Sequence, residues 1–204
     1  MTLQRGLYTL AGFLLLVGFV TLGLSVGERP PPVDVVLADA FRDQYTRPAG
    51  QVAGLVTHVL GPVLPFALGA VLVVVAWRRR DLTVLCVKLA VVLLLCRMTS
   101  LIAKPAFYRE RPREFPDLSY PSGHVVAVAC TGFVAVLLCA WTRPHLTRLA
   151  ITIAAAATVL GALCRIVLGV HWLTDTAGSV LAVGGVGLIS AAGLGLLPLP
   201  KDPA

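Results

Sequence analysis

Six long apolar runs dominate this sequence and limit what it can fold into. They cover about residues 7–26, 52–77, 82–103, 125–141, 149–169 and 177–197. A helix of roughly 20 apolar residues spans a hydrocarbon core of about 30 Å, because it satisfies its own backbone hydrogen bonds where lipid offers no partner. Since 57% of the 204 residues are hydrophobic, the sequence predicts an all-α fold, a bundle of six transmembrane helices that forms a single membrane-embedded domain over residues 1–204.

The first run has an alternative interpretation as a cleaved signal peptide. Arg5 would be its basic start, and Ala38-Asp39-Ala40 resembles a cleavage site. The apolar run is too long for the central region of a signal peptide, and that site lies about a dozen residues beyond it. We therefore expect a membrane helix here.

The positions of Lys and Arg predict how the bundle lies in the membrane. An even number of spans places both termini on one side, and the compact triplet Arg78, Arg79 and Arg80 lies on that side. Other cations of the same face are Arg5, Arg143, Arg148 and Lys201. The positive-inside rule makes this face cytoplasmic, together with both termini. The opposite face carries as many cations: Arg29, Arg42, Arg47, Lys104, Arg109, Arg111 and Arg113. We therefore attribute the net charge of +7 to cations that orient the bundle in the membrane and to cations of a binding site, and we predict no nucleic-acid partner.

Only two polar connections are long enough to hold structure of their own, residues 27–50 and residues 104–123. The first of them lies between the first and second spans. The segment starts Pro-rich and continues with Val35, Val36, Ala40 and Phe41 between acids and arginines. Such a pattern is typical of a short helix at the membrane interface, although a solvated linker fits it equally well. The sequence leaves these two possibilities open for this extracytoplasmic connection.

Three polar segments are expected to meet at one end of the bundle. Lys104 to Arg113 follows the third span, Tyr120 to His124 opens the fourth, and Cys164 to Asp175 joins the fifth to the sixth. Because the spans alternate in direction, all three segments lie on the same face of the membrane. Residues 104–124 and 164–175 are therefore the predicted active-site segments.

These segments carry the donors that a phosphate group requires. Lys104, Arg111 and Arg165 supply forked and point cationic donors for a dianion with several oxygens. Ser122 and Gly123 stand where a helix begins, so free backbone N–H groups and the positive end of the helix dipole face the same place. The sequence therefore predicts a phosphate-binding site.

The segments also carry two histidines suited to phosphate chemistry. His171 and Asp175 are four residues apart and share a face if the sixth helix has already begun. A carboxylate would then hold the imidazole and leave its other nitrogen free to attack. His124, at the mouth of the fourth span, would protonate the leaving oxygen.

The spacing of these residues resembles a known membrane enzyme family. Lys104-(x6)-Arg111-Pro112, then Pro121-Ser122-Gly123-His124, then Arg165-(x5)-His171-(x3)-Asp175 is similar to the three-part signature of the type 2 phosphatidic acid phosphatases, the membrane relatives of the vanadium haloperoxidases. The resemblance covers about residues 100–180. One departure is Cys164, where the family usually has serine, and it puts one auxiliary phosphate hydrogen bond in doubt.

The resemblance implies a metal-independent hydrolase of lipid phosphates or pyrophosphates. His171 would form a phosphohistidine, Asp175 would orient it, and His124 would act as general acid. The phosphoryl oxygens would bind to Lys104, Arg111, Arg165, Ser122 and Gly123, with no metal and no cofactor. The substrate would be an isoprenyl pyrophosphate such as the undecaprenyl carrier, phosphatidic acid or phosphatidylglycerol phosphate, reached among membrane lipids at the outer face of a bacterial plasma membrane.

Other functions fit parts of the same pattern. A phosphotransferase would pass the phosphoryl group from the same phosphohistidine to another acceptor, and a non-catalytic protein would only bind or transport lipid phosphates. A zinc hydrolase using His124, His171 and Asp175 is disfavoured, because the neighbouring cations would repel the metal.

Among the other polar residues, we expect Arg109 and Arg113 to anchor anionic lipids and His58 to be structural or solvated. Arg97, inside the third span, is expected to support the site through a carboxylate or backbone carbonyls.

Overall fold

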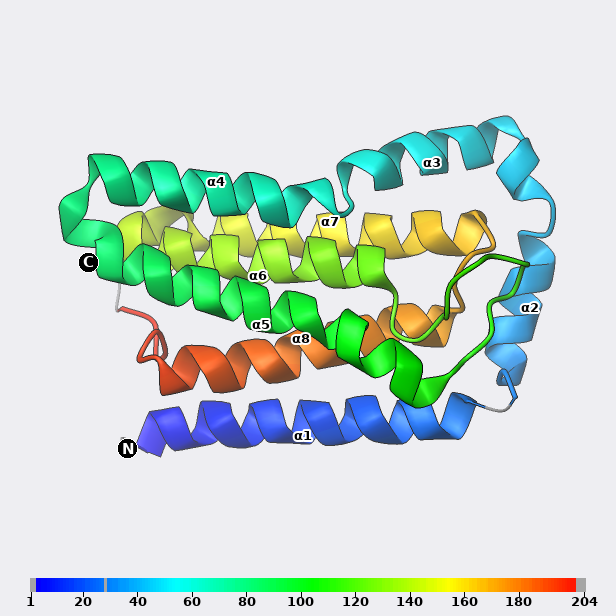
Figure 1. Ribbon diagram of the computed structural model, residues 1–204, viewed down its shortest axis with the longest axis horizontal. Coiled ribbons are helices and arrows are strands. Elements are labelled where there is room, and N and C mark those ends of the chain that lie inside the picture. Colours follow the sequence, from blue (N-terminus) through cyan, green and yellow to red (C-terminus); the bar gives the residue numbers. More distant parts are fainter. Residues whose placement is uncertain (1–2, 28, 201–204) are drawn as a thin grey trace.

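Six helical spans run side by side along the long axis of the molecule (Figure 1). The computed structural model describes residues 3–27 and 29–200, which fold into helices without any strand. The spans long and apolar enough to cross a membrane are Leu3–Val26, Pro48–Arg78, Arg80–Phe107, Gly123–Thr142, Pro144–Val167 and Leu173–Gly193. The predicted all-α bundle of six membrane helices is therefore confirmed. Lys201, one of the cations used to predict topology, lies outside the described residues.

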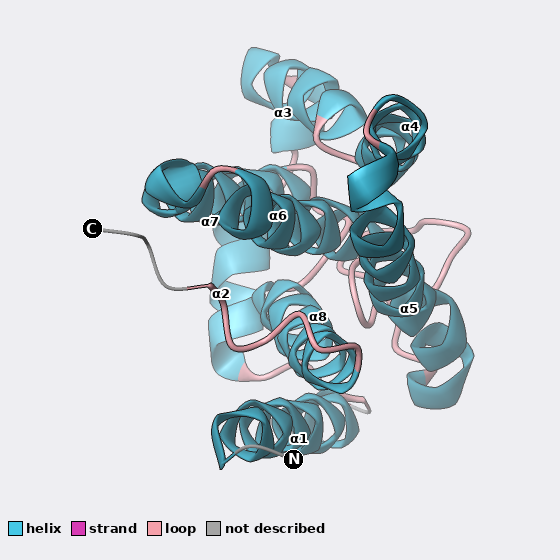
Figure 2. Cartoon of the chain, turned by 90° about the vertical axis from the view of Figure 1, so that its left-hand side faces the viewer, coloured by secondary structure: helices cyan, strands magenta, loops and turns pink. Residues whose placement is uncertain are grey.

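Helices α6 and α8 form the middle of the bundle (Figure 2). Helix α8 packs against α1, α5 and α6, and α6 also packs against α7. The bounds of these helices are Leu3–Val26 for α1, Thr83–Phe107 for α5, Gly123–Thr142 for α6, Thr147–Val167 for α7 and Leu173–Gly193 for α8. Their buried faces are lined by Leu, Val, Ala and Cys. Large apolar side chains such as Phe66 and Trp77 point outward, as expected of a surface that lipid covers.

The second span is two helices rather than the continuous helix that the apolar run predicts. Helix α3 (Pro48–Val59) ends near Leu60, and α4 (Val63–Arg78) begins after Pro62. Proline has no backbone N–H and crowds the preceding turn, so it interrupts the helix at this point. Backbone that is not helical is tolerated at membrane depth where it faces a cavity or other protein. Here Gly61 lies so close to the His124 ring that a Cβ would come within 2.9 Å of it.

Helix α2 (Pro32–Ala40) lies across one end of the bundle, transverse to the long helices (Figure 1). Of the two possibilities left open for this connection, the structure has the short helix, followed by a turn of 3₁₀ helix, η1 (Gln44–Thr46). The orientation of α2 on the bundle is less expected. Val36 is exposed, whereas Asp34 is only 1% exposed. The helix thus turns a carboxylate, and not its valines, towards the bundle.

The two ends of the bundle differ in what they carry. The Arg78–Arg80 triplet lies at the turn between α4 and α5, where the 3₁₀ segment η2 (Arg80–Leu82) begins, and Arg143 precedes the 3₁₀ segment η3 (Pro144–Leu146). Both turns are at the end where α1 starts. Helix α2 and the two predicted active-site segments lie at the other end, as the parity of six spans requires.

Candidate active site

The predicted active-site segments meet around a cavity of about 700 Å³ at the α2 end of the bundle. The predicted site residues that line this cavity are Lys104, Arg111, Gly123, His124, Arg165 and His171. Ser122 and Asp175 lie directly behind its wall and are fully buried. The structure therefore brings together side chains that are up to 71 residues apart in the sequence, from Lys104 to Asp175.

The pairing of His171 with Asp175 arises from a helix cap rather than from a shared helix face. Helix α8 begins at Leu173, so His171 precedes it. Asp175 stands in the first turn, where its Oδ2 accepts the Trp172 backbone N–H at 2.8 Å. The same oxygen lies 3.3 Å from His171 Nδ1. The predicted contact is thus made, but by a different geometry from the one that the spacing suggested.

The contacts of the His171 ring indicate which nitrogen carries the proton. Arg111 Nη1 lies 3.1 Å from His171 Nε2. A guanidinium has only donors, so Nε2 must accept this hydrogen bond. The proton then belongs on Nδ1, which donates it to Asp175. The lone pair of Nε2 consequently points to the cavity and to the cation that would hold a phosphate.

The environment of His171 keeps its ring neutral. Burial is the largest influence and lowers the pKa of His171 to about 4, with the charges of Arg111 and Arg165 acting in the same direction. Asp175 opposes them by its hydrogen bond and its charge. At neutral pH the imidazole is therefore uncharged and has a free lone pair on Nε2, which is the form that can act as a nucleophile.

An anion cradle stands at the start of α6. Ser122 occupies the N-cap position but its side chain makes no capping hydrogen bond. Among the described residues, Ser122 Oγ and Arg165 Nε are buried atoms without a hydrogen-bond partner. Unpaired buried polar atoms are rare in proteins because each costs free energy. Together with the helix N-terminus, these two donors are suited to a ligand with several oxygens.

The loop that precedes α6 is held firmly against α8 and α1. Ser179 Oγ accepts the Ser122 backbone N–H at 2.9 Å, and Tyr120 Oη donates to the Phe19 carbonyl at 2.6 Å. The Tyr120 ring is fully buried and lies against Gly178, where a Cβ would come within 2.4 Å of it. Glycine at position 178 therefore makes room for the ring that fixes the cradle in place.

The other two predicted phosphate ligands are bridged by a carboxylate. Asp117 Oδ2 contacts Lys104 Nζ and lies 3.4 Å from Arg111 Nη2. Burial acts to raise the pKa of Asp117, but Lys104 and Arg111 outweigh it and hold that pKa below its usual range. Asp117 is half exposed while the cations are almost buried. The carboxylate can therefore move into solvent when another anion takes its place.

The structure corrects the expectation that Arg109 anchors anionic lipids. Its guanidinium is buried, and it donates to Asp175 Oδ1 at 2.6 Å and to Asp34 Oδ2 at 2.8 Å. Thr174 completes the cluster, with its N–H donating to Asp34 Oδ1 at 3.1 Å. Arg109 thus joins α2 to the carboxylate that contacts His171. No local pattern in residues 27–50 indicates that Asp34 belongs to this group.

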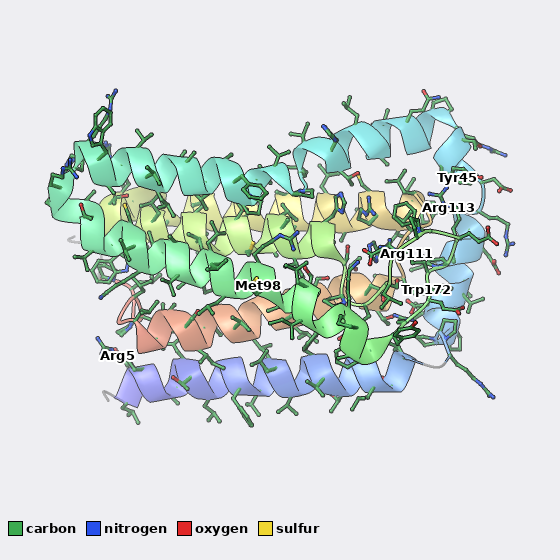
Figure 3. All side chains as sticks on the ribbon, viewed as in Figure 1. Arg5, Tyr45, Met98, Arg111, Arg113 and Trp172 are labelled. Atoms are coloured by element: carbon green, nitrogen blue, oxygen red, sulfur yellow. The ribbon has the colours of Figure 1, made fainter. Side chains whose placement is uncertain are left out.

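The structure also places Arg113, His58 and Arg97. Arg113 lies over the Tyr45 ring at 4.1 Å from its centroid, next to η1 (Figure 3). His58 is exposed, as expected of a solvated residue, and it also lines the active-site cavity. Arg97 also lines the cavity, as expected for a residue that points into the bundle, but its partner is Ser100 Oγ at 2.7 Å rather than a carboxylate or a carbonyl.

The zinc alternative finds no ligand set in the structure. Within residues 3–27 and 29–200, no three side chains of His, Cys, Asp or Glu are grouped so that they could hold a metal ion. The five cysteines are free thiols spread over the spans. Cys164, which stands where the family usually has serine, is buried.

Comparisons with known proteins agree with this geometry. The crystal structure of a transmembrane PAP2 type phosphatidylglycerolphosphate phosphatase from Bacillus subtilis is similar to this chain, with a TM-score of 0.74 and 19% sequence identity. The alignment covers 95% of this chain and 98% of that one. No curated protein sequence matches the chain.

A family model adds the evidence of sequence. The model of the PAP2 superfamily matches residues 82–194, more than half of the chain, and this range includes every predicted site residue. The chain therefore belongs to the PAP2 superfamily, and it is a multi-pass membrane phosphatase of that family.

Proposed function

We propose that the protein hydrolyses a lipid phosphate or pyrophosphate without a metal ion, through a phosphohistidine at His171. The observation that carries this proposal is the arrangement around one cavity of a neutral imidazole, a second histidine and three cationic side chains. Nucleophile, acid and anion donors are the parts that phosphoryl transfer requires when no metal supplies positive charge.

In the first step, the lone pair of His171 Nε2 forms a bond to phosphorus. The bond between phosphorus and the leaving oxygen breaks, and His124 donates a proton to that oxygen. Asp175 accepts the hydrogen bond of Nδ1 and stabilises the positive charge that develops on the ring. The charge on the phosphoryl oxygens is balanced by Lys104, Arg111 and Arg165 and by the start of α6.

In the second step, water attacks the phosphohistidine. His124, now neutral, takes a proton from the water, the P–N bond breaks, and His171 is restored with its lone pair on Nε2. Inorganic phosphate leaves and Asp117 returns to Lys104 and Arg111. The histidine that acted as an acid in the first step thus acts as a base in the second.

The form of the cavity favours a lipid substrate. Besides the site residues it is lined by Gly54 and Thr57 of α3 and by Leu101 and Pro105 of α5. A cavity bounded by two membrane-spanning helices suits a molecule whose head reaches the cations while its tail stays in lipid. The similar structure from Bacillus subtilis is that of a phosphatidylglycerolphosphate phosphatase, and we include that lipid among the candidate substrates with phosphatidic acid and undecaprenyl pyrophosphate.

We place the site at the extracytoplasmic face of a bacterial plasma membrane, with both termini in the cytoplasm. The Arg78–Arg80 triplet at the opposite end supports this orientation by the positive-inside rule. Three of the seven cations at the site end are engaged inside the protein: Arg109 pairs with Asp34 and Asp175, and Lys104 and Arg111 pair with Asp117. They therefore do not weigh against it.

The test is phosphate release from a panel of lipids by the purified protein in detergent. We expect release from at least one of phosphatidylglycerol phosphate, phosphatidic acid and undecaprenyl pyrophosphate, resistance of turnover to a metal chelator, and inhibition by vanadate. Glycerol 3-phosphate, which has no tail, should be a poor substrate.

Labelling the terminal phosphate of the lipid separates the alternatives. Label recovered in inorganic phosphate supports hydrolysis, and label recovered in a second alcohol shows phosphotransfer. Binding of the lipids without release of label by active-site-intact protein would contradict the proposal and favour a lipid-phosphate binding protein.

A further inference from the structure

A second polar group lies in the active-site cavity and has no role in the reaction just described. It consists of Arg97 and Ser100 on α5 with Thr57 and His58 on α3. Arg97 precedes Lys104 by seven residues, about two helical turns, so both side chains leave α5 on the same face and are separated by roughly 10 Å along its axis. Arg97 is thus the deeper cation of the cavity.

The charge of Arg97 has no counterpart in the described part of the protein. Its guanidinium donates to Ser100 Oγ at 2.7 Å, and it forms no ion pair with any carboxylate of residues 3–27 and 29–200. By contrast, Lys104 and Arg111 share Asp117. A cation inside a membrane span costs about 2.5 to 3.5 kcal/mol on insertion scales, so such residues usually mark a functional site.

The contact with Ser100 draws Arg97 towards the leaving-group side of the phosphate site. Ser100 Oγ lies 3.9 Å from the place where a Cβ on Gly123 would stand, so the guanidinium is held close below the start of α6. His124, the proposed acid for the leaving oxygen, follows Gly123 and packs on Gly61 at the break between α3 and α4. The next group of the substrate, on the tail side of the scissile bond, would therefore meet Arg97.

We propose that Arg97, with Ser100, Thr57 and His58, binds a second phosphate of the substrate, located between the scissile phosphate and the lipid tail. This inference rests on the proposed function and narrows the substrate to lipids with two phosphate groups. Two kinds of lipid have this chemistry: isoprenyl diphosphates, where the second phosphate is the leaving group, and lipids whose phosphomonoester is carried by a phosphodiester headgroup. Lipids with a single phosphate leave the Arg97 group without a partner.

The test compares substrates that share a tail and differ in phosphate number. One pair is farnesyl diphosphate and farnesyl monophosphate, and the other is phosphatidylglycerol phosphate and phosphatidic acid. We expect wild-type protein to prefer the two-phosphate member of one pair in kcat/KM, and Arg97→Gln to lower that kcat/KM by about 10- to 100-fold, as expected for loss of a hydrogen bond to a charged group. Turnover of the one-phosphate member should stay unchanged. The pair that responds identifies which kind of second phosphate is bound.

Two variants serve as controls. Arg97→Lys keeps the charge and should restore part of the preference. Lys88→Gln removes a cation from the other half of the same helix, outside the cavity, and should leave both members of each pair unaffected. An equal loss for both members in Arg97→Gln would overturn the inference, because it would indicate a general structural role.

A binding measurement keeps this inference separate from the proposed function. The purified protein is titrated with methylenediphosphonate, which cannot be hydrolysed, or with inorganic phosphate. The thermal unfolding midpoint is measured at each ligand concentration. We expect the diphosphonate to bind at least about 10-fold more tightly to wild type, and the difference to disappear in Arg97→Gln. Equal affinities in wild type, together with equal kcat/KM for the two members of each lipid pair, would overturn the second phosphate site even if lipid phosphates are hydrolysed. Absence of lipid turnover with a retained diphosphonate preference would reject the hydrolase proposal and keep the site.

Discussion

Replacing His171 with alanine is expected to lower kcat for the preferred lipid phosphate by roughly 10⁴- to 10⁶-fold, the range seen when a covalent nucleophile is removed. The ring supplies the electron pair that attacks phosphorus, and the neighbouring cations Lys104 and Arg111 cannot replace it, because an ammonium and a guanidinium carry only hydrogen-bond donors and no free lone pair. The KM should change much less, because the oxygens of the substrate are bound by other groups. Steady-state phosphate release, measured with protein of equal thermal stability, checks this.

The loss of kcat in His171→Ala can be compared with the effect of replacing two other histidines. His124→Ala should lower kcat by about 10²- to 10⁴-fold, since it removes a general acid and base but leaves the nucleophile. His145→Ala should have no effect, because His145 is exposed in η3 at the other end of the bundle. If His171→Ala retained more activity than His124→Ala, His171 would not be the nucleophile.

Replacing Arg109 with methionine is expected to lower the free energy of unfolding by about 3 to 5 kcal/mol, the usual effect of removing one partner of a buried ion pair. Arg109 donates to both Asp34 and Asp175, whose side chains are completely buried. Without the guanidinium, two carboxylates remain in the interior with a smaller number of donors. Thermal or denaturant unfolding in detergent micelles measures the change.

The same substitution should also impair catalysis. Arg109 does not line the cavity but holds Oδ1 of Asp175, whose other oxygen contacts His171. We therefore expect kcat to fall while KM stays nearly constant, and Arg109→Lys to recover part of the activity. Asp34→Asn, which keeps the size of the side chain, should weaken the same cluster more mildly.

Arg42 offers a matched control for this experiment. It pairs with Asp39 at the end of α2, and both side chains are largely exposed. Such surface pairs contribute little to stability, so Arg42→Met should unfold at the wild-type midpoint. An Arg109→Met protein that was as stable and as active as the Arg42→Met protein would show that the buried cluster does not support the site.

Much of the fold could be predicted because lipid leaves few choices. Apolar runs of sufficient length must become helices, and their parity alone places Lys104, His124 and His171 at one end of the bundle. The apolar runs do not show where a helix within them is interrupted. The break between α3 and α4 has a local signal in Gly61-Pro62, but the hydrophobicity of the whole run outweighs it when the sequence is read alone.

The parts of the site that depend on residues close together in the sequence could be predicted. The parts that depend on contacts between residues far apart in the sequence were harder to predict. The donors at the start of α6 follow from Ser122 and Gly123. The apolar pattern places the start of α8 too late, because Asp175 caps that helix as well as contacting His171. Asp34 is separated by 75 residues from Arg109 and by 140 from Thr174, so no local pattern could pair them. In the sequence, Arg109 consequently resembles one more surface cation.

The role of His171 as the nucleophile is tested most directly by trapping the phosphorylated histidine. His124→Ala protein is mixed with an aryl phosphate whose leaving group needs no proton, quenched in alkali, where phosphohistidine survives, and analysed by mass spectrometry. We expect a phosphoryl group on the peptide that contains His171, and none in the His124→Ala, His171→Ala double variant. Release of the aryl group without any phosphate on His171, or with phosphate on another residue, would contradict this role.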